Sequence, residues 1–394
     1  MQFSRRRRAV PALRVGLVKR PRRRIITDVA TGKQEHGRQF RPAWRGRLLS
    51  VWLLVACGLA ARASSDPRKQ APPPASPRSA AAMAAKKAKL QAELKRIPHK
   101  IVYERYRGNT WELVMMNADG SAAVSLTGHT DLNALYPHAS PDGKRICFVA
   151  DEGTGESKSR NVYYMNADGA GRTLVARNAR QPCWTSDGHA VAYMKGEFAR
   201  FTYEDFASKG LFLYDLDSRE HREHPNRSLH HLYNIGWSPD GGWVLATVHG
   251  GMGYRHAILA IEARGTGVFD LKPAEGCRPD LSPDGKKLAW NATDQLIAVA
   301  DLDLQSTPPK VANVRPAITC DKQHEVYHAD WSPDGRYIAF AHGPLGPEQV
   351  GKVAKGWNIC VADAAATDVW VPLTSDGASN KEPDWVPAGG TKGR

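Results

Sequence analysis

The sequence lacks the patterns of several common protein classes. It has six cysteines but no Cys-x-x-Cys pair, and five of them lie beyond residue 63. An odd number cannot all pair within one chain, and most stand in apolar strand patterns, so no disulfide framework is predicted. No Gly-x-Ser-x-Gly motif is present, which argues against a serine peptidase built on a nucleophile elbow.

The folded part also lacks excess positive charge, although the whole chain has a formal net charge of +15. Residues 1–63 hold 16 Lys and Arg against 2 Asp and Glu, whereas residues 98–394 hold 31 against 36. Nucleic-acid binding requires clustered positive charge on the folded surface. We therefore expect no nucleic-acid partner.

The apolar run at 48–60, LLSVWLLVACGLA, is shorter than the roughly 20 residues of a bilayer span and is typical of a signal-peptide core. Residues 1–63 are therefore interpreted as a basic leader with a signal peptide, which predicts a periplasmic or extracellular protein. Cleavage after Ala63 is one possibility. Cleavage before Cys57 is the other, because residues 54–57 resemble a lipobox, and a lipidated Cys57 would tether the protein to a membrane. The long basic stretch before the run also fits a true start downstream of Met1.

Residues 64–97 are interpreted as a linker. Residues 64–78 are rich in Pro, Ser and charge, which is typical of a solvated spacer. Residues 79–97 favour a helix, with Leu90, Leu94 and Ile97 spaced by four and three residues. That segment is expected either to dock on the following domain or to remain a partly disordered tether.

A repeat dominates residues 98–390. The pattern Trp-Ser-Pro-Asp-Gly, followed by an alternating apolar strand, recurs with variations that end at Gly143, Gly188, Gly241, Gly285 and Gly335, and a degenerate copy ends at Gly389. The steps between these glycines are 45, 53, 44, 50 and 54 residues, enough for four short strands each. Pro, Asp and Gly suit the corners of a tight turn. Four-stranded units that cannot bury both faces alone stack around an axis, so the pattern predicts an all-β, six-bladed β-propeller.

The two ends of the repeat region fit closure of the ring. The segment that begins at Lys100 reads as a second strand without a first, and the last copy, around Trp385, supplies a first strand and then stops. We expect the N- and C-terminal strands to share one blade, because this arrangement removes an open sheet edge.

These repeats resemble those of TolB-type propellers. The resemblance rests on the Ser-Pro-Asp-Gly anchors, the Asn-Ala-Asp-Gly turns at 117–120 and 166–169, and the Leu-Thr pairs at 126–127 and 373–374, and it covers residues 98–390. It implies the fold and an envelope location. TolB carries a separate α/β domain before its propeller, whereas about 35 residues separate leader and propeller here, so the resemblance implies no Tol-specific role. Peptidase and lyase propellers have similar repeats.

Strand alternation predicts which side chains face the central axis. Counting back from each anchor Trp, or from its equivalent in the other repeats, the positions three and one before it are mostly polar. The candidate site residues at a channel mouth are Tyr136, His138, Gln181, Asn234, Arg278, Asp280, His328, Asp330, Glu382 and Asp384. They could form a ligand site, or simply line a wet channel. Arg278, His328 and Glu382 occupy the same repeat position in three blades, and Arg278 could hold a carboxylate through two hydrogen bonds.

The longest insertions are expected to open on the same face as this mouth. They are residues 195–209, 249–256 and 342–356, and the first carries Phe198, Phe201, Tyr203 and Phe206. Such an aromatic group favours either a partner-binding patch or a local cover over a blade edge.

His324-Glu325-Val326-Tyr327-His328 matches the zincin motif, which requires a helix. On a strand these histidines would stand about 13 Å apart, too far to share one zinc ion at bond lengths of about 2 Å. No zinc site is therefore predicted at this motif, and no metal ligand or cofactor is assigned, although histidine and aspartate donors at the mouth leave a metal site there open.

Two functional hypotheses follow. The first is an exported, monomeric binding or scaffold module for an envelope protein, peptide or glycan. The second is a metal-assisted polysaccharide lyase or hydrolase acting at the channel mouth, for which the histidine and aspartate donors are the motivation.

Overall fold

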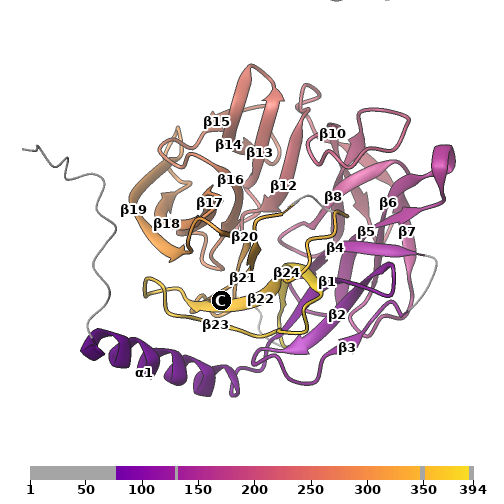
Figure 1. Ribbon diagram of the computed structural model, residues 1–394. Coiled ribbons are helices and arrows are strands. Elements are labelled where there is room, and N and C mark those ends of the chain that lie inside the picture. Colours follow the sequence, from indigo (N-terminus) through magenta and orange to yellow (C-terminus); the bar gives the residue numbers. More distant parts are fainter. Residues whose placement is uncertain (1–76, 129–131, 347–350, 390–394) are drawn as a thin grey trace, which may run out of the picture. The chain divides into compact units, whose positions relative to one another are not determined.

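In the computed structural model, residues 77–128, 132–346 and 351–389 are described (Figure 1). The basic leader, its two candidate cleavage sites and Cys57 lie outside these residues. Six four-stranded antiparallel sheets are arranged as blades around an axis, as the repeat predicts. Within the described residues, no helix combines the length and apolar character needed to cross a bilayer.

The strands of each blade are given from the axis outward. Blade 1 contains β24 (Ser379–Val386), β1 (Lys100–Arg107), β2 (Thr110–Asn117) and β3 (Val124–Ser125). Blade 2 contains β4 (Asn133–Ala139), β5 (Arg145–Glu152), β6 (Ser159–Asn166) and β7 (Thr173–Ala176), with the 3₁₀ turn η2 (Gly155–Ser157) between β5 and β6. Blade 3 contains β8 (Ala179–Trp184), β9 (Ala190–Gly196), β10 (Ser208–Asp215) and β11 (His221–Glu223).

The other three blades follow the chain in the same way. Blade 4 contains β12 (Leu232–Trp237), β13 (Trp243–Gly251), β14 (Tyr254–Glu262) and β15 (Val268–Asp270). Blade 5 contains β16 (Cys277–Leu281), β17 (Lys287–Thr293), β18 (Leu296–Asp303) and β19 (Lys310–Thr319). Blade 6 contains β20 (His324–Trp331), β21 (Tyr337–Pro344), β22 (Asn358–Asp363) and β23 (Trp370–Pro372).

Blade 1 closes the ring, as predicted. Its innermost strand, β24, comes from the end of the chain and pairs antiparallel with β1, so that Ile101 lies opposite Trp385. A buried ion pair joins the same two strands, with Lys381 Nζ 3.8 Å from Glu104 Oε1. Residues far apart in the sequence therefore form one sheet, and no blade is left with an open inner edge.

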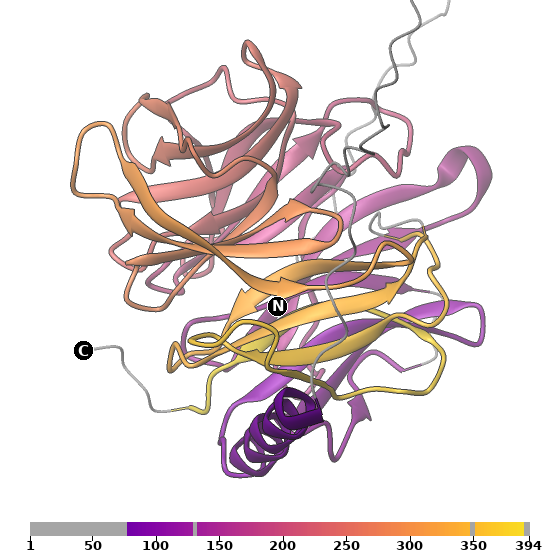
Figure 2. The same ribbon diagram turned by 60° about the vertical axis from the view of Figure 1, so that its left-hand side comes forward.

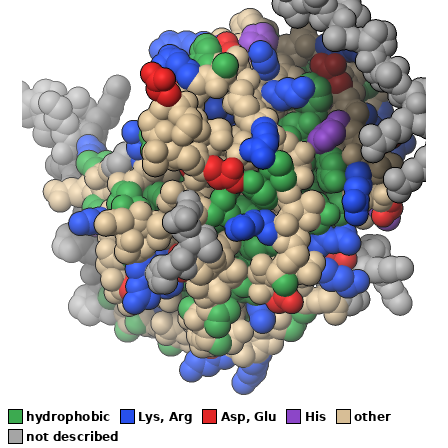
Figure 3. Space-filling view, turned by 90° about the vertical axis from the view of Figure 1, so that its right-hand side faces the viewer, with side chains coloured by type: hydrophobic (Ala, Val, Ile, Leu, Met, Phe, Trp, Pro, Cys, Tyr) green, Lys and Arg blue, Asp and Glu red, His purple; other side chains and the backbone are tan. Residues whose placement is uncertain are grey.

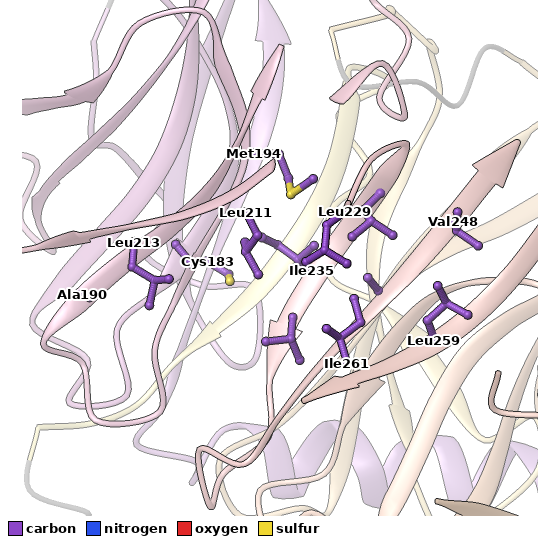
Figure 4. Packing of buried hydrophobic residues seen from close by; sticks show 14 of the residues in the cluster. Cys183, Ala190, Met194, Leu211, Leu213, Leu229, Ile235, Val248, Leu259 and Ile261 are labelled. Carbon is purple, nitrogen blue, oxygen red and sulfur yellow. The ribbon is translucent and has the colours of Figure 1, made fainter. Parts of the chain in front are cut away.

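The hydrophobic core is divided among the junctions between blades. Six clusters of buried side chains each join two neighbouring blades. Figure 4 shows the junction of blades 3 and 4, where Met194 and Leu211 of one blade approach Ile235 and Leu259 of the other. Each blade thus buries both faces only because it has two neighbours, which is the physical basis of the ring.

The helix α1 (Pro77–Leu94) precedes the propeller (Figure 2). Leu90 and Leu94 are buried in the cluster that joins blades 1 and 6, and Glu93 Oε2 accepts a hydrogen bond of 3.2 Å from the Tyr337 hydroxyl. Its last two turns therefore dock beside the blade that closes the ring.

One end of the propeller, here called the turn face, carries the turns that join the first and second strands of blades 2 to 6. In each turn a Ser or Thr hydroxyl donates to the Asp two residues later, as from Ser238 to Asp240 at 2.6 Å. The same carboxylate accepts the backbone N–H of Gly242 at 3.0 Å. Gly143 requires glycine: its φ is +68°, and a Cβ would stand 1.9 Å from the carbonyl oxygen of Pro387.

The opposite end, here called the loop face, carries the connections between the second and third strands. Antiparallel pairing places the β9–β10, β13–β14 and β21–β22 connections at this end. The described parts of the three long insertions, at 195–209, 249–256, 342–346 and 351–356, therefore open on one face.

Candidate functional site

All six innermost strands have a β-bulge that the alternation argument did not include. In β4, for example, the pairing with β5 shifts between Leu135 and His138. The residue at the bulge has φ between +48° and +61° in every blade, and none of the six is a glycine: Tyr136, Gln181, Asn234, Arg278, His328 and Glu382. We call these six residues the loop-side ring. Left-handed backbone at non-glycine residues is held only where surrounding contacts over-determine it.

Contacts between blades hold the loop-side ring. The backbone N–H of Asn234 donates to Gln181 Oε1 at 2.7 Å, and the N–H of Tyr136 donates to Glu104 Oε2 at 3.0 Å. Asn234 Nδ2 donates to the Tyr136 hydroxyl two blades away, and Arg278 Nη1 of the neighbouring blade donates to Asn234 Oδ1, both at 2.7 Å.

The remaining two members of this ring form a pair. His328 Nδ1 lies 2.7 Å from Glu382 Oε2, and both side chains are buried. The nearby Glu104 is also fully buried, and this burial raises the pKa of its carboxyl group to about 7 although Lys381 opposes the shift. The centre of the propeller is therefore filled at this level by charged and polar side chains that contact one another.

Nearer the turn face, a second set of predicted residues connects the blades. We call His138, Asp280, Asp330 and Asp384 the turn-side ring. The Asp280 carboxylate accepts a hydrogen bond from the backbone N–H of Trp331 at 2.7 Å. In the same way Asp330 accepts a hydrogen bond from the N–H of Trp385 at 2.7 Å, and Asp384 accepts one from the N–H of Ala139 at 2.8 Å. Each aspartate thus fastens its strand to the next blade, from blade 5 through blades 6 and 1 to blade 2.

Burial and the proximity of like charges disfavour the ionised form of two aspartates in the turn-side ring. Burial raises the pKa of Asp280 to about 7 and that of Asp330 well above its ordinary value, and the negative charge of Asp384 adds to both shifts. Burial disfavours the charged form of His138, but the hydrogen bond and charge of Asp384 outweigh it and raise the pKa. The 2.8 Å contact between His138 Nδ1 and Asp384 Oδ2 is therefore an ion pair that persists at higher pH than for an exposed histidine.

The aromatic insertion of blade 3 covers the axis at the loop face. Its Asp205 is buried, with carboxylate oxygens 3.7 Å from Arg160 Nη1 of blade 2 and 3.8 Å from Arg278 Nη2 of blade 5. Phe201 and Tyr203 lie under Lys158 Nζ, which is 4.2 and 4.5 Å from the two ring centroids. The insertion is therefore a cover, although over the axis and not over a blade edge, and a partner-binding role for its aromatic side chains stays a prediction.

Two long insertions meet above the axis. Lys352 Nζ, from the β21–β22 connection, is 4.3 Å from the ring centroid of Tyr203, and Val353 packs against the cluster that joins blades 2 and 3. Blades 3 and 6 stand on opposite sides of the ring, so these loops span it. Each carries a large exposed hydrophobic side chain, Phe198 at 39% and Leu345 at 57% exposure.

The zincin-like motif lies on a strand, β20, as the sequence predicted. His324 contacts Asp321 and stacks on His342, whereas His328 faces the axis and contacts Glu382. Across residues 77–128, 132–346 and 351–389, no three His, Cys, Asp or Glu side chains are grouped so that they could hold one metal ion.

Sequence reasoning missed several charged residues around the predicted mouth. These are Glu104, Asp151, Arg160, Arg180, Asp205 and Lys381, all of which are buried. Five of them stand in strands, and only some of those strands have an apolar pattern in which a charged residue is conspicuous. Asp205 lies in the insertion, in which only the aromatic residues attracted attention.

Comparison with known proteins supports the fold. No family model and no curated protein sequence matches the chain. Among solved structures, TolB from Acinetobacter baumannii has a TM-score of 0.54 at 19% identity, covering 80% of this chain and 74% of that one. A chain of a nidogen/laminin complex has a TM-score of 0.51 at 9% identity, covering 74% and 99%. An oligogalacturonate lyase in complex with manganese has a TM-score of 0.40 at 13% identity, covering 64% and 87%. The chain therefore has a TolB-like β-propeller fold.

Proposed function

We propose that this TolB-like propeller is an exported binding module of the cell envelope that recognises a protein, peptide or glycan through its loop face. The observation that carries the proposal is the contact of Lys352 with Tyr203, which brings together the described parts of the blade 6 and blade 3 insertions above the axis, where Phe198 and Leu345 are exposed on them. Apolar surface that is contiguous and rimmed by polar residues is typical of a binding site, and the aromatic and aliphatic side chains of these two insertions are proposed to form one.

Hydrophobic side chains are also exposed elsewhere on the molecule. Figure 3 shows the side on which blade 2 lies in Figure 1, where hydrophobic side chains lie between lysine and arginine side chains. The only other large hydrophobic side chains exposed among the described residues are Val124 and Val314, on the outermost strands β3 and β19. Export itself is inferred from the leader, and a lipid anchor at Cys57 remains part of the same proposal.

Site-specific photocrosslinking tests the binding face. A photoreactive amino acid is placed at Phe198 or Leu345 in the full chain, and at Val314 as a matched exposed control. After irradiation in envelope extracts, we expect the same discrete adduct from the first two positions and none from Val314. Equal labelling at Val314, or no adduct at Phe198 and Leu345, would count against the loop face.

One observation favours a second function, an enzyme acting on polysaccharide. Asp280 has a pKa raised to about 7, which suits a general acid or base near neutral pH, and it lies in the turn-side ring with His138 and Asp384. Purified protein, with its metal content measured, is incubated with acidic polysaccharides and assayed for new reducing ends or unsaturated products. Activity lost in Asp280→Asn but kept in Asp240→Asn would support the enzyme.

A further inference from the structure

Arg180 is a buried cation beneath the aromatic insertion. It is 2% exposed, and its Nη1 donates to the backbone carbonyl of Glu204 at 2.6 Å. No carboxylate of the described residues lies within 4.0 Å of it, and its Nε has no hydrogen-bond partner there. Burial and the neighbouring charge of Arg160 lower its pKa to about 10. An arginine in this state is costly to bury and favours the approach of an anion.

Burial lowers the pKa of Arg180, and the charges of Asp205, Asp151 and Glu204 raise it only from a distance, without a direct ion pair to it. Arg160 is held by Asp151 through two hydrogen bonds of 2.7 and 3.0 Å. Asp205 stands between Arg160 and Arg278 at the longer distances of 3.7 and 3.8 Å. Asp151 and Asp205 therefore contact other guanidinium groups, and neither of them lies within 4.0 Å of Arg180.

The cover is attached mainly by side chains. Residues 197–206 contain no strand, and their base is closed by the hydrogen bond from the Glu197 N–H to the Ala207 carbonyl at 3.1 Å. Above the axis the segment is held by the Asp205 ion pairs, the Arg180 contact and the cation–π contacts of Phe201 and Tyr203. Such contacts can be exchanged for equivalent ones without breaking a blade.

We propose that residues 197–206 are a displaceable cover, and that an acidic segment of a partner protein replaces Asp205 at Arg278 and supplies the carboxylate that Arg180 lacks. This inference rests on the proposed binding function and names its ligand class. The planar fork of each arginine suits a carboxylate. Asp205 then acts as an internal competitor, present at high effective concentration because it is in the same chain.

A protein ligand is favoured over an acidic glycan because the cover, which now occupies the site, is itself a peptide segment. The cover reads Arg-Phe-Thr-Tyr-Glu-Asp-Phe over residues 200–206, so the site already holds an acidic aromatic peptide. Its aromatic rings are matched to Lys158 and Lys352, which would stack equally on aromatic side chains of a partner.

The test uses the full chain and a synthetic capped peptide with the sequence of residues 200–206. Binding is measured by calorimetry for the wild type, Asp205→Asn and Glu220→Gln. Glu220 is an exposed carboxylate of the same blade outside the cover, so it is the matched control. We expect Asp205→Asn to bind the peptide at least about tenfold more tightly than the wild type, by removal of the internal competitor, and Glu220→Gln to match the wild type.

Further arms identify the recognised group. A peptide with Asn in place of its Asp should lose the gain, and adding Arg180→Gln to Asp205→Asn should abolish it, with folding of each variant checked by thermal unfolding. If Arg180→Gln does not fold, Arg278→Gln is the alternative. Equal peptide affinity in the wild type and Asp205→Asn would overturn the proposal. Binding of trigalacturonate instead of the peptide would also overturn it, in favour of a glycan.

The outcome is separable from that of the proposed function. Crosslinking at Phe198 and Leu345 that is unaffected by Asp205→Asn, together with absent peptide binding, would refute the cover but leave the binding face intact. Peptide binding without any crosslinked envelope partner would support the carboxylate site and refute the envelope role.

Discussion

The two ends of the propeller differ in how they use the repeat. At the turn face, five blades present the same hydrogen-bonded turn, in which Ser or Thr and Asp stabilise a glycine corner. At the loop face the connections differ in length, and two of them meet above the axis. Repetition therefore marks the part of the molecule that maintains the fold, whereas departure from the repeat marks the part where a ligand can be selected.

Removal of the closing strand should have the largest effect, because it destroys both ends of this comparison. Deleting residues 382–394 removes most of β24 and its pairing with β1. We expect loss of cooperative folding of the whole propeller, since blades 1 and 6 then lose a shared core. Thermal unfolding followed by circular dichroism measures this, and an unchanged melting temperature would refute closure by β24.

Matched glycine substitutions compare the two ends directly. Gly143→Ala at the turn face introduces a Cβ 1.9 Å from the Pro387 carbonyl oxygen, in addition to a positive φ. Gly250→Ala at the loop face has a similar φ of +64° but no atom within 4 Å of the new Cβ. We expect Gly250→Ala to lower the free energy of unfolding by about 1 kcal/mol through backbone strain alone. Gly143→Ala should lower it clearly more. Denaturant unfolding checks the order, and equal costs would show that the turn face is not tightly packed.

The turn aspartates should affect stability without affecting binding. Replacing Asp142, Asp240, Asp284 or Asp334 by Ala removes a carboxylate that accepts from both a side chain and the backbone. Each should cost on the order of 1 kcal/mol, by analogy with other capping losses. Adduct formation at Phe198 should persist. Lost crosslinking at full stability would assign a function to the turns.

The smallest expected effect concerns pH and the turn-side ring. Because the folded-state pKa of Asp280 is raised to about 7, the folded protein binds this proton more strongly than the unfolded chain does. Stability should therefore fall as pH rises from about 4 to above 7. Asp280→Asn keeps an oxygen acceptor for the Trp331 N–H and removes the charge. Its melting temperature should exceed that of the wild type at pH 8 and match it near pH 4, and a difference independent of pH would refute the assignment.

The contribution of Asp240 to stability should depend on pH in the opposite direction. Hydrogen bonds from Ser238 and from the Gly242 N–H lower its pKa, so its contribution is present above about pH 4 and is lost as pH falls further. Comparison of Asp240→Asn with Asp280→Asn across pH thus separates the two groups of aspartates.

Much of the architecture was predictable because the repeat is local. The spacing of the turn glycines indicated six blades, and the incomplete repeats at 100 and 385 indicated ring closure. The axis-facing positions were also found by counting from the anchor residues, although the bulge at Tyr136 and its five equivalents was not. A bulge depends on the neighbouring blade, whose side chains accept the displaced N–H groups, and alternation along one strand contains no such information.

The sequence by itself therefore determined the number of blades, the closure of the ring and the structural role of the turn residues, because turn chemistry and strand period act within a few residues. Only the tertiary structure decided that Asp205 reaches Arg160 and Arg278. It also left Arg180 without a carboxylate within 4.0 Å among the described residues. These residues belong to blades 2, 3 and 5, and Coulomb interactions between them depend on distances that the closed ring alone sets.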